Sequence, residues 1–200
     1  MKYLSVGLGL LACAAMMSSC GGGTLGGGSR LLITREADGN RDIYLLSSTG
    51  ATLQRITSDA QSDEAPRWSP DGTRVAFIRR DTGAGSQALY FMNADGSNPQ
   101  NLYPGGLAVT DQPFYPAWLN NDMVLFRRGA SAPADLAKRS IGGGDVTAVT
   151  TPGTDFDDVP TVSPDGTKIA FVRVSGSSSA LYIAHSDGTN AHSVITDAGR

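Results

Sequence analysis

Short apolar runs separated by turn motifs dominate the chain after residue 30. Residues 75–78 (Val-Ala-Phe-Ile) and 169–172 (Ile-Ala-Phe-Val) are apolar at every position. Strict alternation would indicate a strand with one solvated face, whereas short continuous runs indicate a strand that is buried on both faces. No 3.6-residue periodicity occurs between the turns, so helices are not predicted there. The pattern therefore predicts short strands in sheets that are covered on both sides.

Two kinds of turn motif bound these runs. Residues 69–72 and 163–166 read Ser-Pro-Asp-Gly, which suits a type I turn because Pro is preset for its second position and Gly favours its fourth. Residues 95–96 and 187–188 read Asp-Gly, the strongest short signal for a hairpin. In the unit around the first of these motifs we expect four strands, near residues 65–69, 73–79, 87–93 and 99–103.

The runs and turns recur as a long repeat. Segment 68–79 matches segment 162–173 at an offset of 94, and Tyr44, Tyr90 and Tyr182 are spaced by 46 residues and by twice that number. A degraded copy lies between them near residues 116–127, where Asn-Asn-Asp replaces Ser-Pro-Asp-Gly, and an earlier copy begins at Leu31. Antiparallel sheets that are covered on both faces and repeated at this period are typical of a radial propeller.

The sequence thus predicts an all-β fold, a β-propeller of about four four-stranded antiparallel blades. Their approximate limits are residues 30–62, 63–110, 111–156 and 157–200. The first unit has sequence for only three strands, because no Trp-Ser-Pro-Asp-Gly segment precedes it. Three arrangements remain open: a small ring closed without strand exchange, an open arc covered by a partner or a second copy, and a truncated gene product. We expect an incompletely closed propeller.

These residues resemble the WD40-like (PD40) propeller repeats of the TolB family. That repeat combines an acidic residue, Pro, Trp-Ser-Pro-Asp-Gly, an apolar strand ending in Phe, an Ile-Tyr pair and a closing Leu-Thr. The closing pairs here are Ile56-Thr57, Val149-Thr150 and Ile195-Thr196, whereas Leu102-Tyr103 departs from the pattern. The resemblance covers about residues 30–198, and it implies the fold more strongly than the function, because such repeats occur in unrelated contexts.

The first twenty residues have a different character. A short basic start precedes an uncharged apolar run over residues 4–17, which is too short to span a bilayer and suits the h-region of a secretory signal. Small residues before Cys20 resemble the lipobox of bacterial lipoproteins, which implies lipidation of Cys20. Cys13 is a rival site, and an ordinary signal peptide is the alternative. Residues 21–29 are Gly-rich and suit a flexible tether.

This leader predicts an exported protein that is lipid-anchored to a bacterial membrane and faces the periplasm. Gly21 after the cysteine is compatible with the outer membrane. Both cysteines lie in the leader, so the predicted propeller has neither a disulfide nor a cysteine nucleophile. The formal net charge is −3, and no basic stripe indicates nucleic-acid binding.

Acidic residues recur where each unit approaches its first strand. If these positions lie on one rim, their carboxylates could form a ring around the central channel. Such a ring could bind Ca²⁺, which prefers oxygen ligands, or attract a basic segment of a partner. The alternative is that the side chains cap the turns by accepting hydrogen bonds from nearby backbone amides. The candidates are Asp63, Glu64, Asp111, Asp155, Asp157 and Asp158.

Other candidate chemistry is sparse. His185 and His192 flank a predicted hairpin with only Asp187 nearby, so we favour a solvated hairpin over a metal site. The pairs Arg79-Arg80 and Arg127-Arg128 recur after the second strand of their units, and indicate either a solvated rim or a clamp for a phosphate or carboxylate. No nucleophile elbow or phosphate loop is present, and we predict neither a catalytic residue, a resident metal nor a cofactor.

The sequence therefore favours a binding scaffold over an enzyme. We expect an envelope-anchored, TolB-like propeller that binds a protein or peptide partner through loops on one rim. The alternative is the propeller part of a hydrolase, either a peptidase or a polysaccharide-degrading enzyme, whose catalytic part is missing or unrecognised.

Overall fold

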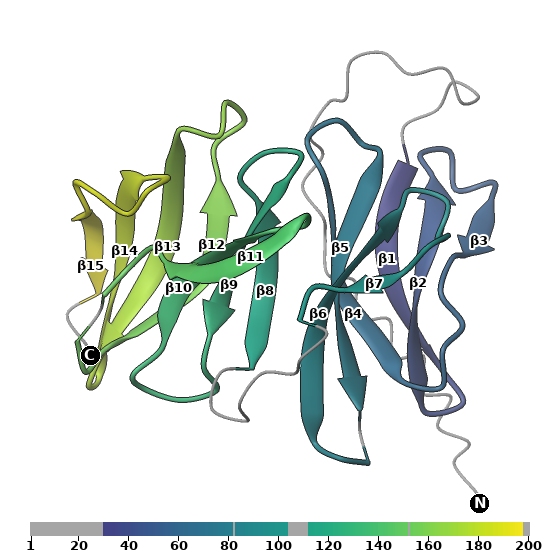
Figure 1. Cartoon of the computed structure of the whole chain (residues 1–200), viewed down its shortest axis with the longest axis horizontal. Coiled ribbons are helices and arrows are strands. Elements are labelled where there is room, and N and C mark those ends of the chain that lie inside the picture. Colours follow the sequence, from purple (N-terminus) through teal and green to yellow (C-terminus); the bar gives the residue numbers. More distant parts are fainter. Residues whose placement is uncertain (1–29, 82, 104–111, 152, 198–200) are drawn as a thin grey trace, which may run out of the picture.

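The computed structural model describes residues 30–81, 83–103, 112–151 and 153–197. Within these ranges the chain has no α-helix and forms four antiparallel sheets, which we call blades 1 to 4 in chain order (Figure 1). Cys20 and its neighbours lie outside the described residues, as does Asp111. In the part of the chain that is described, no helix has the length and hydropathy needed to cross a bilayer.

Consecutive strands pair within each blade, so every blade is a simple meander. Blade 1 contains β1 (Arg30–Ala37), β2 (Asn40–Ser47) and β3 (Leu53–Arg55). Blade 2 contains β4 (Ser62–Trp68), β5 (Arg74–Asp81), β6 (Ser86–Asn93) and β7 (Gln100–Asn101). Blade 3 contains β8 (Pro113–Trp118), β9 (Met123–Arg128), β10 (Asp135–Ser140) and β11 (Gly143–Ala148). Blade 4 contains β12 (Phe156–Val162), β13 (Lys168–Ser175), β14 (Ser178–His185) and β15 (His192–Asp197).

The Ser-Pro-Asp-Gly motifs form the predicted turns between the first and second strands of blades 2 and 4. The backbone N–H of Gly72 donates to the carbonyl oxygen of Ser69 at 2.9 Å, and Gly72 has a φ of 68°, which glycine adopts without strain. The Asp71 carboxylate accepts hydrogen bonds from the Ser69 hydroxyl and the Thr73 backbone N–H. The same contacts recur in residues 163–168, so the two turns were predicted correctly from sequence.

Three apolar cores lie between neighbouring blades. In blades 1 to 3 we call the face that points toward the next blade in chain order the forward face, and the opposite face the backward face. In blade 4 the forward face is the one opposite to the face that contacts blade 3. The blade 1–2 core includes Leu32, Ile43, Leu45 and Ile56 against Val75, Phe77 and Met92. The blade 2–3 core includes Ala76, Ile78, Leu89, Phe91 and Leu102 against Trp118, Val124, Phe126 and Ala137. The blade 3–4 core includes Leu119, Leu125, Leu136 and Val149 against Ile169, Phe171 and Ala184. Both faces of blades 2 and 3 are therefore covered, as the apolar runs predicted.

The four blades form an open arc. Figure 1 shows blade 1 at one end of the long axis and blade 4 at the other, with blades 2 and 3 between them. Among the described residues, blade 1 has three strands and no strand equivalent to β4, β8 and β12. Among the described strands, substantial packing between blades joins chain neighbours only. The prediction of an incompletely closed propeller is thus confirmed.

Candidate binding surface on the inner strands

The first strands of the three complete blades lie along the line where the blades converge. Strand β8 contacts both β4 and β12, and β4 contacts β1 and β2 of blade 1. Each of these inner strands carries a bulge, at which the register with the second strand shifts. The bulges place one non-glycine residue of each strand in the left-handed region: Ala65, Tyr115 and Val159, with φ of 54°, 47° and 48°.

The bulges follow from a shared Xaa-Pro sequence. Pro66, Pro116 and Pro160 come directly after the left-handed residues, and proline has no N–H to give to a ladder. A left-handed conformation costs a non-glycine residue about 1–3 kcal/mol, and a β-branched residue such as Val159 rarely adopts it. Tyr115 and Val159 are also exposed, at 39% and 53%. Strands β8 and β12 therefore present strained, exposed apolar side chains at this repeated position, whereas Ala65 on β4 is partly buried against the blade 2–3 core.

Buried ion pairs fix the inner strands of blades 2 and 4 to their second strands. Arg79 donates from Nε and Nη2 to the two carboxylate oxygens of Asp63, at 2.7 and 2.9 Å. Arg173 makes the equivalent pair with Asp157, at 2.6 and 2.7 Å. Both carboxylates are fully buried. Burial raises the pKa of Asp63 while Arg79 opposes that rise, and hydrogen bonds to Asp157 raise the pKa of Arg173.

A second set of ion pairs joins neighbouring blades. Glu64 on β4 accepts from Arg41 of blade 1 at 2.9 Å, and it also pairs with Arg80 of its own blade at 2.7 Å. Asp158 on β12 accepts from Arg127 of blade 3 at 3.1 Å. These contacts lie beside the bulges and couple the inner strand of one blade to the preceding blade.

Aromatic rings enclose the guanidinium of Arg127. Its carbon lies 3.8 Å from the ring centroid of Phe114 and 4.7 Å from that of Phe156, which belong to adjacent inner strands. The side chain of Arg127 is only 7% exposed. A guanidinium over aromatic faces gains cation–π energy, which partly offsets the cost of burying its charge. This cluster fills the junction between the inner strands of blades 3 and 4.

The predicted rim acids lie in two groups. Asp63 and Glu64 are on β4, whereas Asp157 and Asp158 are on β12 and Asp155 comes just before it. Between the groups, β8 carries Pro113 and Phe114 at the positions equivalent to Asp63 and Glu64. Among the described residues no three His, Cys, Asp or Glu side chains are placed to bind a metal ion. The ring and its calcium stay predictions, because Asp111 lies outside those residues.

One predicted alternative, capping, is visible at Asp158. Its Oδ1 atom accepts from the backbone N–H of Val159 at 2.8 Å, directly at the bulge. The Arg79 side chain, which the recurrent Arg-Arg pairs suggested as a carboxylate clamp, binds carboxylates of this chain, with Asp59 at 2.9 Å in addition to Asp63. The sequence singled out Asp63 and Arg79 separately as candidates. That they bind each other follows only from the register of β4 and β5.

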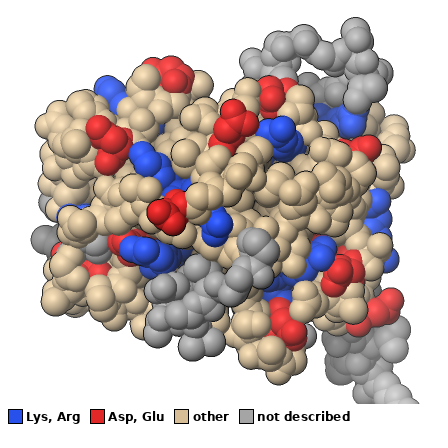
Figure 2. Space-filling model, in the orientation of Figure 1, with Lys and Arg blue, Asp and Glu red and all other residues tan. Residues whose placement is uncertain are grey.

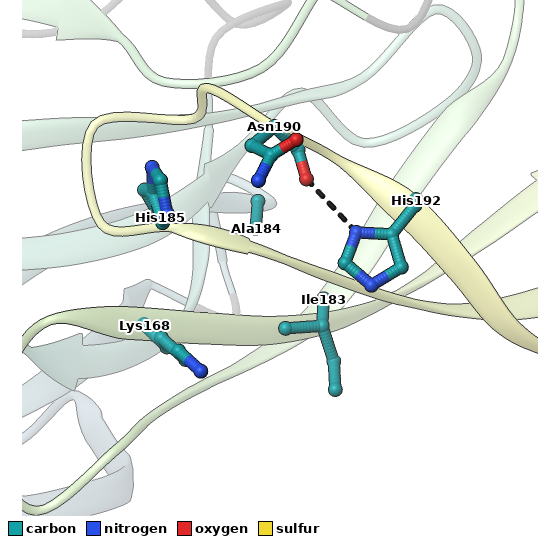
Figure 3. Close-up of a pocket in the computed structure, with 6 residues that line it drawn as sticks. All are labelled: Lys168, Ile183, Ala184, His185, Asn190 and His192. Carbon is teal, nitrogen blue, oxygen red and sulfur yellow. Dashed lines mark hydrogen bonds between the residues drawn. The ribbon is translucent and has the colours of Figure 1, made fainter.

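The two histidines lie at the far side of blade 4, beside a shallow depression of about 80 Å³ (Figure 3). His185 Nδ1 is 3.1 Å from the hydroxyl of Thr189, and His192 Nδ1 donates to the backbone carbonyl of Asn190 at 3.0 Å. The two imidazoles thus bond within their own hairpin and do not converge in Figure 3. Both histidines line the depression, and each is engaged within its own hairpin.

Charged side chains are dispersed over one face of the molecule. Figure 2 shows basic and acidic groups interspersed on one face of the arc, without a continuous field of either sign. Interspersed charges of both signs favour solubility and give little long-range attraction for a polyanion or a polycation. The inner strands are therefore distinguished by their exposed apolar bulges and paired charges.

The fan of meander blades with apolar cores between them defines a β-propeller protein. The TolB β-propeller domain family (PD40) matches residues 25–200, and this chain belongs to that family. A protein TolB homolog of Chlorobium luteolum is 28% identical over 145 residues, which cover 72% of this chain and 31% of the relative. The Tol-Pal system protein TolB 1 of Novosphingobium aromaticivorans is 35% identical over 80 residues, covering 40% of this chain and 16% of the relative.

Solved structures support the same fold. A putative TolB from Agrobacterium tumefaciens superimposes with a TM-score of 0.70 at 20% identity, over 84% of this chain and 61% of that one. TolB from Acinetobacter baumannii gives 0.66 at 25% identity, over 82% and 40%. A structure from an analysis of two prolyl endopeptidases gives a TM-score of 0.63 at 18% identity, over 85% of this chain and 27% of that one. This chain thus spans less than two thirds of the length of each.

Proposed function

We propose that this protein is an envelope-anchored, TolB-like scaffold that binds a protein or peptide partner along its inner strands. The observation that carries the proposal is the exposure of Tyr115 and Val159 at equivalent strained bulges of adjacent blades. Strained backbone that the surrounding fold maintains is enriched at binding sites. Tyrosine in particular supplies a large amphipathic contact with few rotatable bonds.

The paired charges support binding over catalysis. A glycosidase needs two free carboxyl groups, one to donate a proton and one to attack or to activate water. Asp63 and Asp157 are instead buried and held bidentately by arginines, which leaves their oxygens occupied. The fixed pairs and buried aromatic rings give a rigid surface, which lowers the entropic cost of binding an extended segment.

The partner we propose belongs to the cell envelope. One relative is named as a Tol-Pal system protein, and the leader sequence of this chain predicts export. A lipid on Cys20 and the Gly-rich residues that follow would keep the arc near a membrane while leaving its inner strands accessible.

Lipidation of Cys20 is tested by metabolic labelling of the full chain with an alkyne fatty acid in a Gram-negative host. We expect Cys20→Ser to abolish the label and to release the protein from the membrane fraction. Cys13→Ser is the matched control, because it removes the other cysteine of the same leader, and it should label normally. Label that is lost only with Cys13→Ser would move the anchor to that residue, and label on neither would refute the anchor.

Partner binding is tested by placing a photoreactive phenylalanine analogue at position 115. We expect a discrete protein adduct after irradiation of intact cells, because the bulge exposes this side chain at the inner strands. The matched control is the same analogue at position 53, where Leu53 is similarly exposed on β3. The adduct should fall severalfold when Val159→Ser is added. Equal adducts at both positions, or hydrolysis of peptide or polysaccharide substrates by the purified chain, would overturn the proposal.

A further inference from the structure

The forward face of blade 4 has the composition of an interface but is not covered by any described strand. Its residues correspond to those with which blade 2 contacts blade 3, because β5 and β6 pair in the same register as β13 and β14. In blade 2 these residues are buried: Ala76, Ile78, Leu89, Phe91 and Leu102. In blade 4 their counterparts are partly or largely exposed: Ala170, Val172, Leu181, Ile183 and Ile195.

The difference in exposure is largest at the closing residue of each blade, which is the first residue of its closing pair. Ile56, Leu102 and Val149 are 8%, 4% and 7% exposed, because the following blade packs over them. Ile195 occupies the same repeat position and is 64% exposed. Large apolar patches on soluble proteins mark interaction sites. At the three covered closing residues, the surface that packs over this position is the backward face of the following blade.

A glycine on the following blade completes each tight junction of this kind. A Cβ atom on Gly96 would collide with the carbonyl oxygen of Ile56, and a Cβ atom on Gly188 would collide with that of Val149. Gly50 occupies the equivalent turn of blade 1 and has the same left-handed backbone, with a φ of 73°. No described atom lies within 4 Å of a Cβ placed on Gly50. Ile195 and Gly50 are thus unmatched halves of a junction that the chain forms twice elsewhere.

Blade 1 supplies the remainder of the complementary surface. Leu31, Ile33 and Leu46 lie on its backward face and are partly exposed. Their counterparts in blade 2 are Val75, Phe77 and Met92, which are at most 1% exposed because blade 1 covers them. In the part of the chain that the structure describes, no strand covers the forward face of blade 4 or the backward face of blade 1, and these two faces lie at opposite ends of the arc (Figure 1).

We infer that the forward face of blade 4 binds the backward face of blade 1 of a second copy of this chain. The contact is head-to-tail, so it closes a ring of copies if the curvature permits and otherwise extends a chain. Ile195 of one copy lies against Gly50 of the next, as Ile56 lies against Gly96. A second copy is the occupant we choose because it presents the matching sheet, the matching glycine and the apolar residues in one register.

The experiment measures the mass of the full chain in solution, in a Cys20→Ser background that removes any lipid. Sedimentation over a series of concentrations should show reversible association at micromolar protein. Ile195→Asp should weaken association by about tenfold or more, since it places a charge in the centre of the apolar contact. Val194→Asp is the control on the same strand, because the residues that precede the closing residue in covered blades, Arg55, Asn101 and Ala148, remain exposed or partly exposed. It should change association little.

The opposite surface is tested at Gly50. Gly50→Asn keeps a residue that tolerates the left-handed backbone but adds the Cβ atom that the junction excludes, so association should fall similarly. Gly39→Asn is its control, since Gly39 has a φ of 79° and equally open surroundings at another turn of the same blade. That variant should associate normally, and circular dichroism should show that all four variants are folded.

Mixing the two defective variants separates head-to-tail from other contacts. Ile195→Asp retains a normal blade 1 and Gly50→Asn retains a normal blade 4, so together they should form a dimer that does not grow further. A wild-type monomer at all concentrations, equal effects of Val194→Asp and Ile195→Asp, or no dimer on mixing would overturn the inference. The last two outcomes would indicate that the forward face of blade 4 is covered by a sheet of another protein, by a segment of the same chain, or by the same face of a second copy. None of these results bears on partner binding at Tyr115, which lies on a different strand.

Discussion

Blades 2 and 4 contain the same motifs and the same strand register, yet they differ in how much of each is protected from water. Blade 2 is covered on both faces, and its residues Leu89 and Ala76 are fully buried. Among the described residues, blade 4 is covered on its backward face only, and Leu181 and Ala170 at the same positions remain partly exposed. Nearly identical sequence therefore makes unequal contributions to stability, because in a repeat fold the energy of a unit depends on its neighbours.

The largest expected effect concerns the buried ion pair of blade 2. Arg79→Met leaves the Asp63 carboxylate buried without its cation, which should cost about 3–5 kcal/mol of unfolding free energy at neutral pH. Arg35 occupies the same position in blade 1, where it is exposed and no described inner strand supplies a carboxylate. Arg35→Met should therefore cost about 0.5 kcal/mol or less. Urea unfolding of both variants measures the difference.

The pH dependence of Arg79→Met provides an internal control. Burial already raises the pKa of Asp63 above its ordinary value of 3.8, and loss of Arg79 should raise it further. The folded state then binds a proton more readily than the unfolded state, so the variant regains stability as the pH falls through the raised pKa. A deficit that stays constant from neutral to acidic pH would show that packing, and not the unpaired charge, causes the loss.

A pair of cavity-forming substitutions compares the two forward faces directly. Leu89→Ala should cost about 3 kcal/mol, because the fully buried side chain leaves a cavity between blades 2 and 3. Leu181→Ala should cost about 1 kcal/mol, since less area returns to water. Both are best measured by urea unfolding with Ile195→Asp present, so that association does not cover Leu181. Equal losses would mean that something covers blade 4 in solution.

The smallest expected effect tests a feature that the two blades share. Hydrogen bonds from Ser163, followed by those from Thr167, lower the pKa of Asp165 to about 2. Because the folded pKa lies below the unfolded one, the turn stabilises the protein above about pH 4 and loses this contribution as the pH falls toward 2. Asp165→Asn should flatten that part of the stability curve, as measured by urea unfolding between about pH 2 and pH 5. If the wild type and Asp165→Asn lose stability equally as the pH falls, the role assigned to the Asp165 carboxylate is wrong.

Local sequence was sufficient to predict the blades but not the pairings between them. The turn motifs, the doubly apolar runs and the 46-residue spacing predicted the all-β arc and its three-stranded first blade, since turns and strands depend on nearby residues. The pair of Asp63 with Arg79 depends on the strand register, and the bulge shifts that register between Glu64 and Arg67. A simple count along the strands therefore cannot assign the partner.

The bulges themselves had a readable signal. Proline follows the left-handed residue in all three inner strands, and its missing N–H disrupts a ladder there. The sequence does not reveal that the disruption is resolved by a left-handed Tyr115 or Val159, because this conformation is unfavourable locally and is maintained by contacts between blades. The exposed apolar character of the inner strands is thus a property of the assembled arc.

The glycines at the blade junctions also allow neighbouring sheets to approach closely. At Gly96 and Gly188 the backbone of one blade approaches the closing strand of the previous blade closer than any side chain would allow. A methyl group at either position would act as a wedge, opening the angle between two sheets and displacing every later blade by a distance that grows along the arc. Gly166 makes a third such approach, to the carbonyl oxygen of Leu119, so the spacing of neighbouring blades depends on the absence of a side chain at all three positions.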